Sequence, residues 1–177
     1  MGGISAYAIP EILPEVSGLS QENDLITLMA ITQFGHRFVL WPHRWNTLQL
    51  DCTLDWKLVP FSEASAEQLP DEFGVYAFLI QPQIASLNLT YLMYVGKTDR
   101  TFRERFREYL RERDSGKIRP KLLKILPQYP DHLFFAYAAA PSGYSPADLE
   151  TALLHAFVPP GNDQLDAEFT RADKAFL

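Results

Sequence analysis

The order of hydrophobic and polar positions gives the first third of the chain a β-like pattern. The apolar runs Leu25–Ile31 and Phe38–Trp41 have the length of strands, and a turn containing Gly35 separates them. Leu48–Leu54 then alternates apolar and polar residues, as a half-buried strand does. The pattern therefore predicts an N-terminal β-rich region that ends near Phe61.

Segments without such a pattern flank this region. Residues 1–24 are rich in Pro, Glu and Ser, which favours an extended or loosely ordered segment. Residues 62–70 are interpreted as a linker with one short helical turn. Trp41, Trp45 and Trp56 are the only tryptophans of the chain. We expect them to fill a small core, and a base-stacking role is the alternative.

The second part of the chain is divided more clearly into elements. Gly74–Ile80 and Thr90–Val95 have the composition of strands, and the loop between them contains Pro82. The two could pair as a hairpin with a long loop. His132–Ala139 is the third strand candidate.

Helical spacing of apolar residues marks the remaining segments. Thr98–Asp114 places Phe102, Phe106, Tyr109 and Leu110 on one side of a helix that Gly116 ends. Lys117–Leu126 predicts a shorter basic helix. Ser145, followed by Pro and an acid, starts a helix that runs to about Val158. The order β-β-α-α-β-α predicts an α+β fold, a small three-stranded antiparallel sheet flanked by helices.

Composition narrows the class of protein. Of the 177 residues, 47% are hydrophobic, which suffices for a packed core. No stretch approaches the roughly 20 apolar residues of a membrane span, and the N-terminus has no secretory pattern. Cys52 is the single cysteine, so no internal disulfide can form. The four histidines show no metal-ligand spacing. We therefore expect a cytoplasmic protein without contact to membranes.

The charge is unevenly distributed. The net charge is −6, but the segment from Tyr91 to Lys124 holds eleven Lys and Arg against five Asp and Glu. The segment thus carries +6 and the rest of the chain −12. A local basic surface can bind phosphates although the whole chain is acidic. A solvated helix face with paired charges is the other interpretation.

An ordered set of short motifs spans the second part of the chain: Gly74-Val75-Tyr76, Tyr94-Val95-Gly96-Lys97-Thr98, Arg105-Phe106, Leu149-Glu150 and Pro160-Gly161-Asn162. The set resembles the GIY-YIG nuclease family over residues 72–165. The resemblance implies a nuclease domain over residues 71–177, whereas residues 1–70 would be an N-terminal extension without an assigned role.

The residue types fit phosphodiester hydrolysis. The reaction needs an activated water, stabilisation of negative charge on the phosphate and help for the leaving oxygen. Glu150 lies in the first turns of its helix, at the rim of the core, and could hold one Mg²⁺ or Mn²⁺ ion. A first-turn glutamate stabilised by the helix dipole is the structural alternative.

The resemblance assigns roles to the other residues. Tyr76 would activate the water, and Tyr94 would position the phosphate or support proton transfer. Arg105 would clamp the phosphate, with Arg103 as the substitute, and Lys97 would lower the pKa of a tyrosine or bind the phosphate. Asn162 is similar to the family's asparagine, which hydrogen-bonds the first strand. The nucleic-acid backbone would be bound by Arg100, Arg103, Arg107, Lys117, Arg119, Lys121 and Lys124.

The sequence therefore predicts a metal-dependent endonuclease that hydrolyses DNA phosphodiester bonds. A catalytically silent module that binds nucleic acid or protein on the same fold is the alternative. A homodimer or a protein partner, bound through the N-terminal region, is expected as a further association.

Overall fold

The computed structural model describes residues 21–48, 50–82 and 89–162. The chain divides into two compact units, Met1–Gly35 and His36–Leu177. In the first unit, the described residues form helix α1, Gln21–Phe34. The second unit contains the other helices, α2 (Pro42–Thr47), α3 (Phe102–Ser115) and α4 (Pro146–Phe157). None of the helices within these described ranges is long and apolar enough to cross a membrane.

The second unit is built on one antiparallel sheet of four strands. The strands are β1 (Lys57–Pro60), β2 (Gly74–Ile80), β3 (Tyr91–Thr98) and β4 (Leu133–Ala139), in the order β1-β4-β2-β3. The α+β class and the hairpin of β2 and β3 are as expected. The expectation of three strands was wrong, because β1 pairs with β4 across more than seventy residues of sequence.

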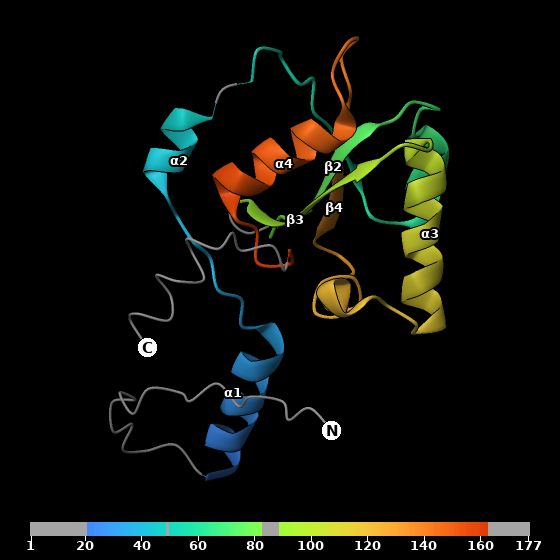
Figure 1. The fold of residues 1–177 in the computed structure, drawn as a ribbon. Coiled ribbons are helices and arrows are strands. Elements are labelled where there is room, and N and C mark those ends of the chain that lie inside the picture. Colours follow the sequence, from blue (N-terminus) through green and yellow to red (C-terminus); the bar gives the residue numbers. More distant parts are fainter. Residues whose placement is uncertain (1–20, 49, 83–88, 163–177) are drawn as a thin grey trace, which may run out of the picture. The chain divides into compact units, whose positions relative to one another are not determined.

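The sheet separates two hydrophobic clusters. Helix α3 and helix α4 lie on opposite sides of it (Figure 1). On the α3 side, Tyr76 and Phe78 pack with the buried residues of α3. On the α4 side, Val75 and Ala77 pack with Leu149 and Leu153 of α4. This division follows from the strand, in which successive side chains point to opposite faces.

The two main helices begin and end as the sequence indicates. Thr101 and Glu104 form a capping box at the start of α3, in which each side chain accepts a hydrogen bond from the other residue's backbone amide. Gly116 ends α3 in the left-handed conformation, with φ 68°. At the start of α4, the Ser145 side chain accepts a hydrogen bond from the Ala147 amide.

The expected N-terminal strands are not present. Leu25–Ile31 belongs to α1, and neither Phe38–Trp41 nor the described residues of Leu48–Leu54 are strands. A short apolar run fits a helix as well as a strand, so its periodicity does not decide between them. The expected linker at residues 62–70 contains the 3-10 helix η1, Glu63–Gln68.

Two further expectations need correction. In the segment Lys117–Leu126, only Pro120–Leu122 forms a helix, the 3-10 helix η2. Pro120 has no amide hydrogen to donate and restricts the residue before it, which prevents an α-helix that starts at Lys117. The tryptophans do not fill a core either: Trp45 and Trp56 are 38% and 40% exposed, respectively.

Candidate active site at the free edge of strand β3

Tyr76 is the buried centre of the candidate site. Its side chain has no exposed surface, and its ring stacks on Phe135 with 5.2 Å between the ring centroids. The Tyr76 hydroxyl lies 2.6 Å from the hydroxyl of Tyr109 on α3. Across the hairpin, Gly96 leaves the room for this ring, since an added Cβ would lie 2.5 Å from the Tyr76 Cζ atom. The phenol is therefore fixed in position by its neighbours.

Arg105 forms hydrogen bonds with both phenols, those of Tyr76 and Tyr109, and with Glu108. Its Nε donates to the Tyr76 hydroxyl at 3.1 Å, and its Nη2 donates to the Tyr109 hydroxyl at 3.0 Å. Its Nη1 donates to Glu108 at 2.7 Å. All three nitrogens of the guanidinium group are thus hydrogen-bonded, which gives the group a fixed orientation. Tyr109 was not among the predicted site residues, although its position four residues after Arg105 places it on the same helix face.

Tyr94 is the more accessible tyrosine of the group. It lies opposite Phe78 in the hairpin, and its ring centroid is 6.3 Å from that of Tyr76. Burial and the neighbouring Tyr76 raise the pKa of Tyr94 to about 12, although hydrogen bonding to Tyr109 works in the opposite direction. At neutral pH the Tyr94 phenol is therefore protonated and can donate a hydrogen bond.

Glu150 approaches the same place from the other side of the sheet. It is half-buried on α4, as expected, and burial raises the pKa of its carboxyl group above the ordinary value. The charge of Lys97, a backbone hydrogen bond with Lys97 and the charges of Arg105 and Lys121 lower this pKa, but burial outweighs them. Lys97 also forms an ion pair with Asp99 at 2.6 Å. The carboxylate thus lies within electrostatic reach of three cations.

Asn162 holds the free edge of β3. Its side-chain oxygen accepts a hydrogen bond from the Val95 amide at 2.9 Å, and its side-chain amide donates to the Val95 carbonyl at 2.8 Å. Both edge groups of Val95 are therefore satisfied. The expected partner was the first strand, β2, and this was wrong: β2 lies between β3 and β4, so its backbone groups are already paired.

Arg103 and Arg105 differ in the groups that they contact. Arg103 points away from the tyrosines: its Nε and Nη2 donate to the Leu69 carbonyl at 3.1 and 2.7 Å, and it pairs with Asp71 at 3.1 Å. It anchors the segment before β2. Arg105 alone of the two contacts Tyr76.

Acidic neighbours hold several of the cations that were expected to bind the nucleic-acid backbone. Arg100 pairs with Glu108 at 2.7 Å, and Arg107 and Arg119 form close ion pairs with Glu67 and Glu112. Lys117, Lys121 and Lys124 have exposed side chains. Much of the positive charge of the segment is therefore compensated locally.

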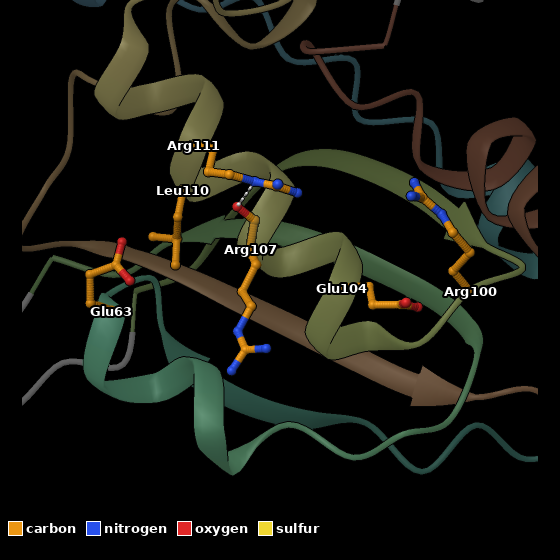
Figure 2. Close-up of a pocket in the computed structure, with 6 residues that line it drawn as sticks. All are labelled: Glu63, Arg100, Glu104, Arg107, Leu110 and Arg111. Carbon is orange, nitrogen blue, oxygen red and sulfur yellow. Dashed lines mark hydrogen bonds between the residues drawn. The ribbon is translucent and has the colours of Figure 1, made fainter.

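A pocket beside α3 is separate from the tyrosines, Glu150 and Asn162. Figure 2 shows its lining, which includes Arg107 and Arg111 of α3 and Glu63 of η1, together with Arg100, Glu104 and Leu110. None of the tyrosines of the site, Glu150 or Asn162 lines it.

The donor set around Glu150 fits a metal site with one protein ligand. Within residues 21–48, 50–82 and 89–162, no three His, Cys, Asp or Glu side chains form a group that could hold an ion. Mg²⁺ keeps several waters and often takes only one or two carboxylates besides phosphate oxygens. Burial raises the pKa of the Glu150 carboxyl group, whereas the charges of Lys97, Arg105 and Lys121 lower it. A further positive charge there would stabilise the carboxylate.

The site therefore combines three phenols and a guanidinium group on the α3 side with a carboxylate and a lysine on the α4 side. It lies where both faces meet, at the free edge of β3. Comparisons of the chain with protein-family models, with curated proteins and with solved structures found no match.

Proposed function

We propose that this protein is a metal-dependent endonuclease that hydrolyses phosphodiester bonds of DNA at the edge of β3. The observation that carries the proposal is the convergence of Tyr76, Tyr94, Arg105 and Glu150 from four separate elements. Replacing a buried, paired polar network with well-packed apolar residues is often neutral or stabilising, so stability alone does not explain these groups. The resemblance to GIY-YIG nucleases implies a site with the same residue types.

The burial of the two tyrosines suggests a division of their roles. Tyr76 has no exposed surface and is held by Arg105 and Tyr109, so we assign it to positioning the guanidinium group. Tyr94 is only partly buried and is assigned to contact with the water or the phosphate. Because its pKa is about 12, it needs a nearby cation to accept a proton at neutral pH. The sequence assigned activation of the water to Tyr76, and this proposal moves the contact with the water to Tyr94.

The remaining residues would hold the metal ion, stabilise charge on the phosphate and position strand β3. Glu150 would hold a single Mg²⁺ or Mn²⁺ ion, which when bound supplies positive charge at the phosphate and lowers the pKa of its waters. Lys97 and Arg105 stabilise negative charge that develops on the phosphate oxygens. Asn162 keeps the β3 edge in place through Val95.

A cleavage assay tests the proposal. The purified protein is incubated with single-stranded, duplex and branched DNA in the presence of Mg²⁺ or Mn²⁺. We expect cleavage that falls at least 100-fold in Glu150→Ala, about the loss that follows removal of one stabilising group from an active site. Glu67→Gln, which removes an exposed carboxylate on the other side of α3, is the control. No cleavage by the wild type, or equal cleavage by both variants, contradicts the proposal.

A module that binds without catalysis is the second candidate. The observation that favours it is the complete burial of Tyr76, whose hydroxyl is engaged by Tyr109 and Arg105. Calorimetry with Mg²⁺ and Mn²⁺ separates the two functions. Metal binding that disappears in Glu150→Ala supports the enzyme, whereas DNA binding without metal binding supports the module.

A further inference from the structure

Three arginine side chains converge on the carboxylate of Glu108. The Nη2 of Arg100 lies 2.7 Å from its Oε1 atom, and the Nη1 of Arg105 lies 2.7 Å from Oε2. The Nη2 of Arg119 lies 4.0 Å from the same Oε2 atom. Arg100 precedes α3, Arg105 lies within it and Arg119 follows it. The carboxylate thus occupies the centre of a cluster of cations.

Glu112 is a second acid of the cluster and forms a close ion pair with Arg119. Two further acids lie near the arginines, since Glu150 interacts electrostatically with Arg105 and Glu104 with Arg100. The Oε2 atom of Glu112 is buried and has no hydrogen-bond partner among the described residues. An arrangement that served stability alone would satisfy this oxygen.

Glu108 accepts a hydrogen bond from Nη1 of Arg105, the guanidinium nitrogen that is not bound to a buried phenol. The other two nitrogens are bound to the hydroxyls of Tyr76 and Tyr109, which are buried. Nη1 donates to Glu108, whose side chain is 24% exposed. Burial opposes ionisation of Glu108, but hydrogen bonds from Arg105 and Arg100 hold its pKa below the ordinary value. At neutral pH, a phosphate that binds Arg105 therefore has to displace a charged carboxylate.

We propose that Arg100, Arg105 and Arg119 form a binding site for a phosphate group of the nucleic-acid backbone, and that Glu108 occupies this site until the substrate displaces it. Guanidinium groups bind carboxylate and phosphate oxygens with the same paired geometry. The phosphate carries the anionic oxygens that the carboxylate otherwise supplies. The identification of the ligand as nucleic acid rests on the proposed function, whereas the phosphate site itself does not.

Removal of the carboxylate's charge tests the proposal. Inorganic phosphate is titrated into the protein without metal at pH 7 and low salt, and its binding is measured by calorimetry. We expect Glu108→Gln to bind phosphate at least 10-fold more tightly than the wild type, because the amide no longer competes as an anion. Glu67→Gln removes the partner of Arg107, another arginine of α3, and is the matched control. Equal affinities of the two variants overturn the proposal.

A second pair of variants keeps Glu108 in place. Arg100 has a side chain that is 55% exposed, so Arg100→Ala is expected to fold, as is Arg107→Ala with 48% exposure. We expect Arg100→Ala to weaken phosphate binding at least threefold relative to Arg107→Ala. Equal phosphate binding by these two variants also overturns the proposal.

The result of the phosphate-binding experiments can be distinguished from the result of the DNA cleavage assay. Tighter phosphate binding by Glu108→Gln, together with a wild type that cleaves no DNA, supports the phosphate site and contradicts the nuclease. DNA cleavage by the wild type without any gain in phosphate affinity contradicts the phosphate site and leaves the nuclease in place.

Discussion

Replacing Tyr109 with Phe removes one hydroxyl from the buried network and tests whether that network stabilises the fold. The hydroxyl lies 2.6 Å from that of Tyr76 and accepts a hydrogen bond from Arg105 at 3.0 Å. Leaving a buried polar partner unsatisfied costs about 1–3 kcal/mol. Because Tyr76 keeps its bond from Arg105, we expect a loss of about 2 kcal/mol in the free energy of unfolding. For a chain of this size, such a loss lowers Tm by roughly 4–8 °C.

The double variant identifies the cause. In Tyr76→Phe/Tyr109→Phe, both partners of the short hydrogen bond are absent, so neither leaves the other unsatisfied. Urea unfolding of the two single variants and the double variant gives the coupling free energy, which we expect to be about 1 kcal/mol. Tyr91→Phe, at a position that is 43% exposed, is the control and should change stability by less than about 0.5 kcal/mol. Additive losses, or a Tyr109→Phe variant as stable as the wild type, would refute the reasoning.

Three further predictions concern the same region. Gly96→Ala places a Cβ 2.5 Å from the Tyr76 Cζ atom and should cost about 1–3 kcal/mol in urea unfolding; an unchanged midpoint contradicts the tight contact. Asn162→Ala removes two hydrogen bonds to Val95, so hydrogen exchange of the Val95 amide should accelerate at least 10-fold, and unchanged protection would show that another group satisfies it. Burial raises the pKa of Tyr94 to about 12. The shift therefore contributes to the free energy of unfolding in full below pH 10, the ordinary pKa of tyrosine, and this contribution is lost as the pH rises to 12. The stability of Tyr94→Phe, measured by circular dichroism, should therefore fall less with pH than that of the wild type between pH 10 and 12. Identical pH profiles of the two proteins would contradict the shift.

The polar groups of the site interrupt an otherwise aromatic core. Phe135 stacks on Tyr76 at 5.2 Å between ring centroids, and Phe78 contacts Tyr109 edge-on at 5.1 Å. Phe106 in turn packs edge-on against Phe135 at 5.2 Å. In such surroundings a hydrogen bond is strong, but an unsatisfied group is costly. The network is therefore rigid as long as all its members are present. The guanidinium group of Arg105 is held in one orientation, because all three of its nitrogens are hydrogen-bonded.

Many elements in the second part of the chain could be predicted from local patterns. The β2 segment, the apolar side of α3 and the Ser145 start of α4 agree with the structure almost residue by residue. These features depend on neighbours within a few positions in the sequence, namely alternation along a strand, helical spacing and side-chain caps. The pairing of β2 with β3 was also predictable, since the two are consecutive antiparallel strands.

The sequence by itself thus determined the local elements and the residue types of the site. Only the tertiary structure decided which of those residues meet. It placed Arg105 rather than Arg103 against Tyr76, added Tyr109 and joined Asn162 to Val95. It also made Leu25–Ile31 part of a helix and added β1 to the sheet. These outcomes depend on contacts between residues far apart in the chain, or on an apolar run that fits helix and strand equally well, and periodicity along the sequence contains neither.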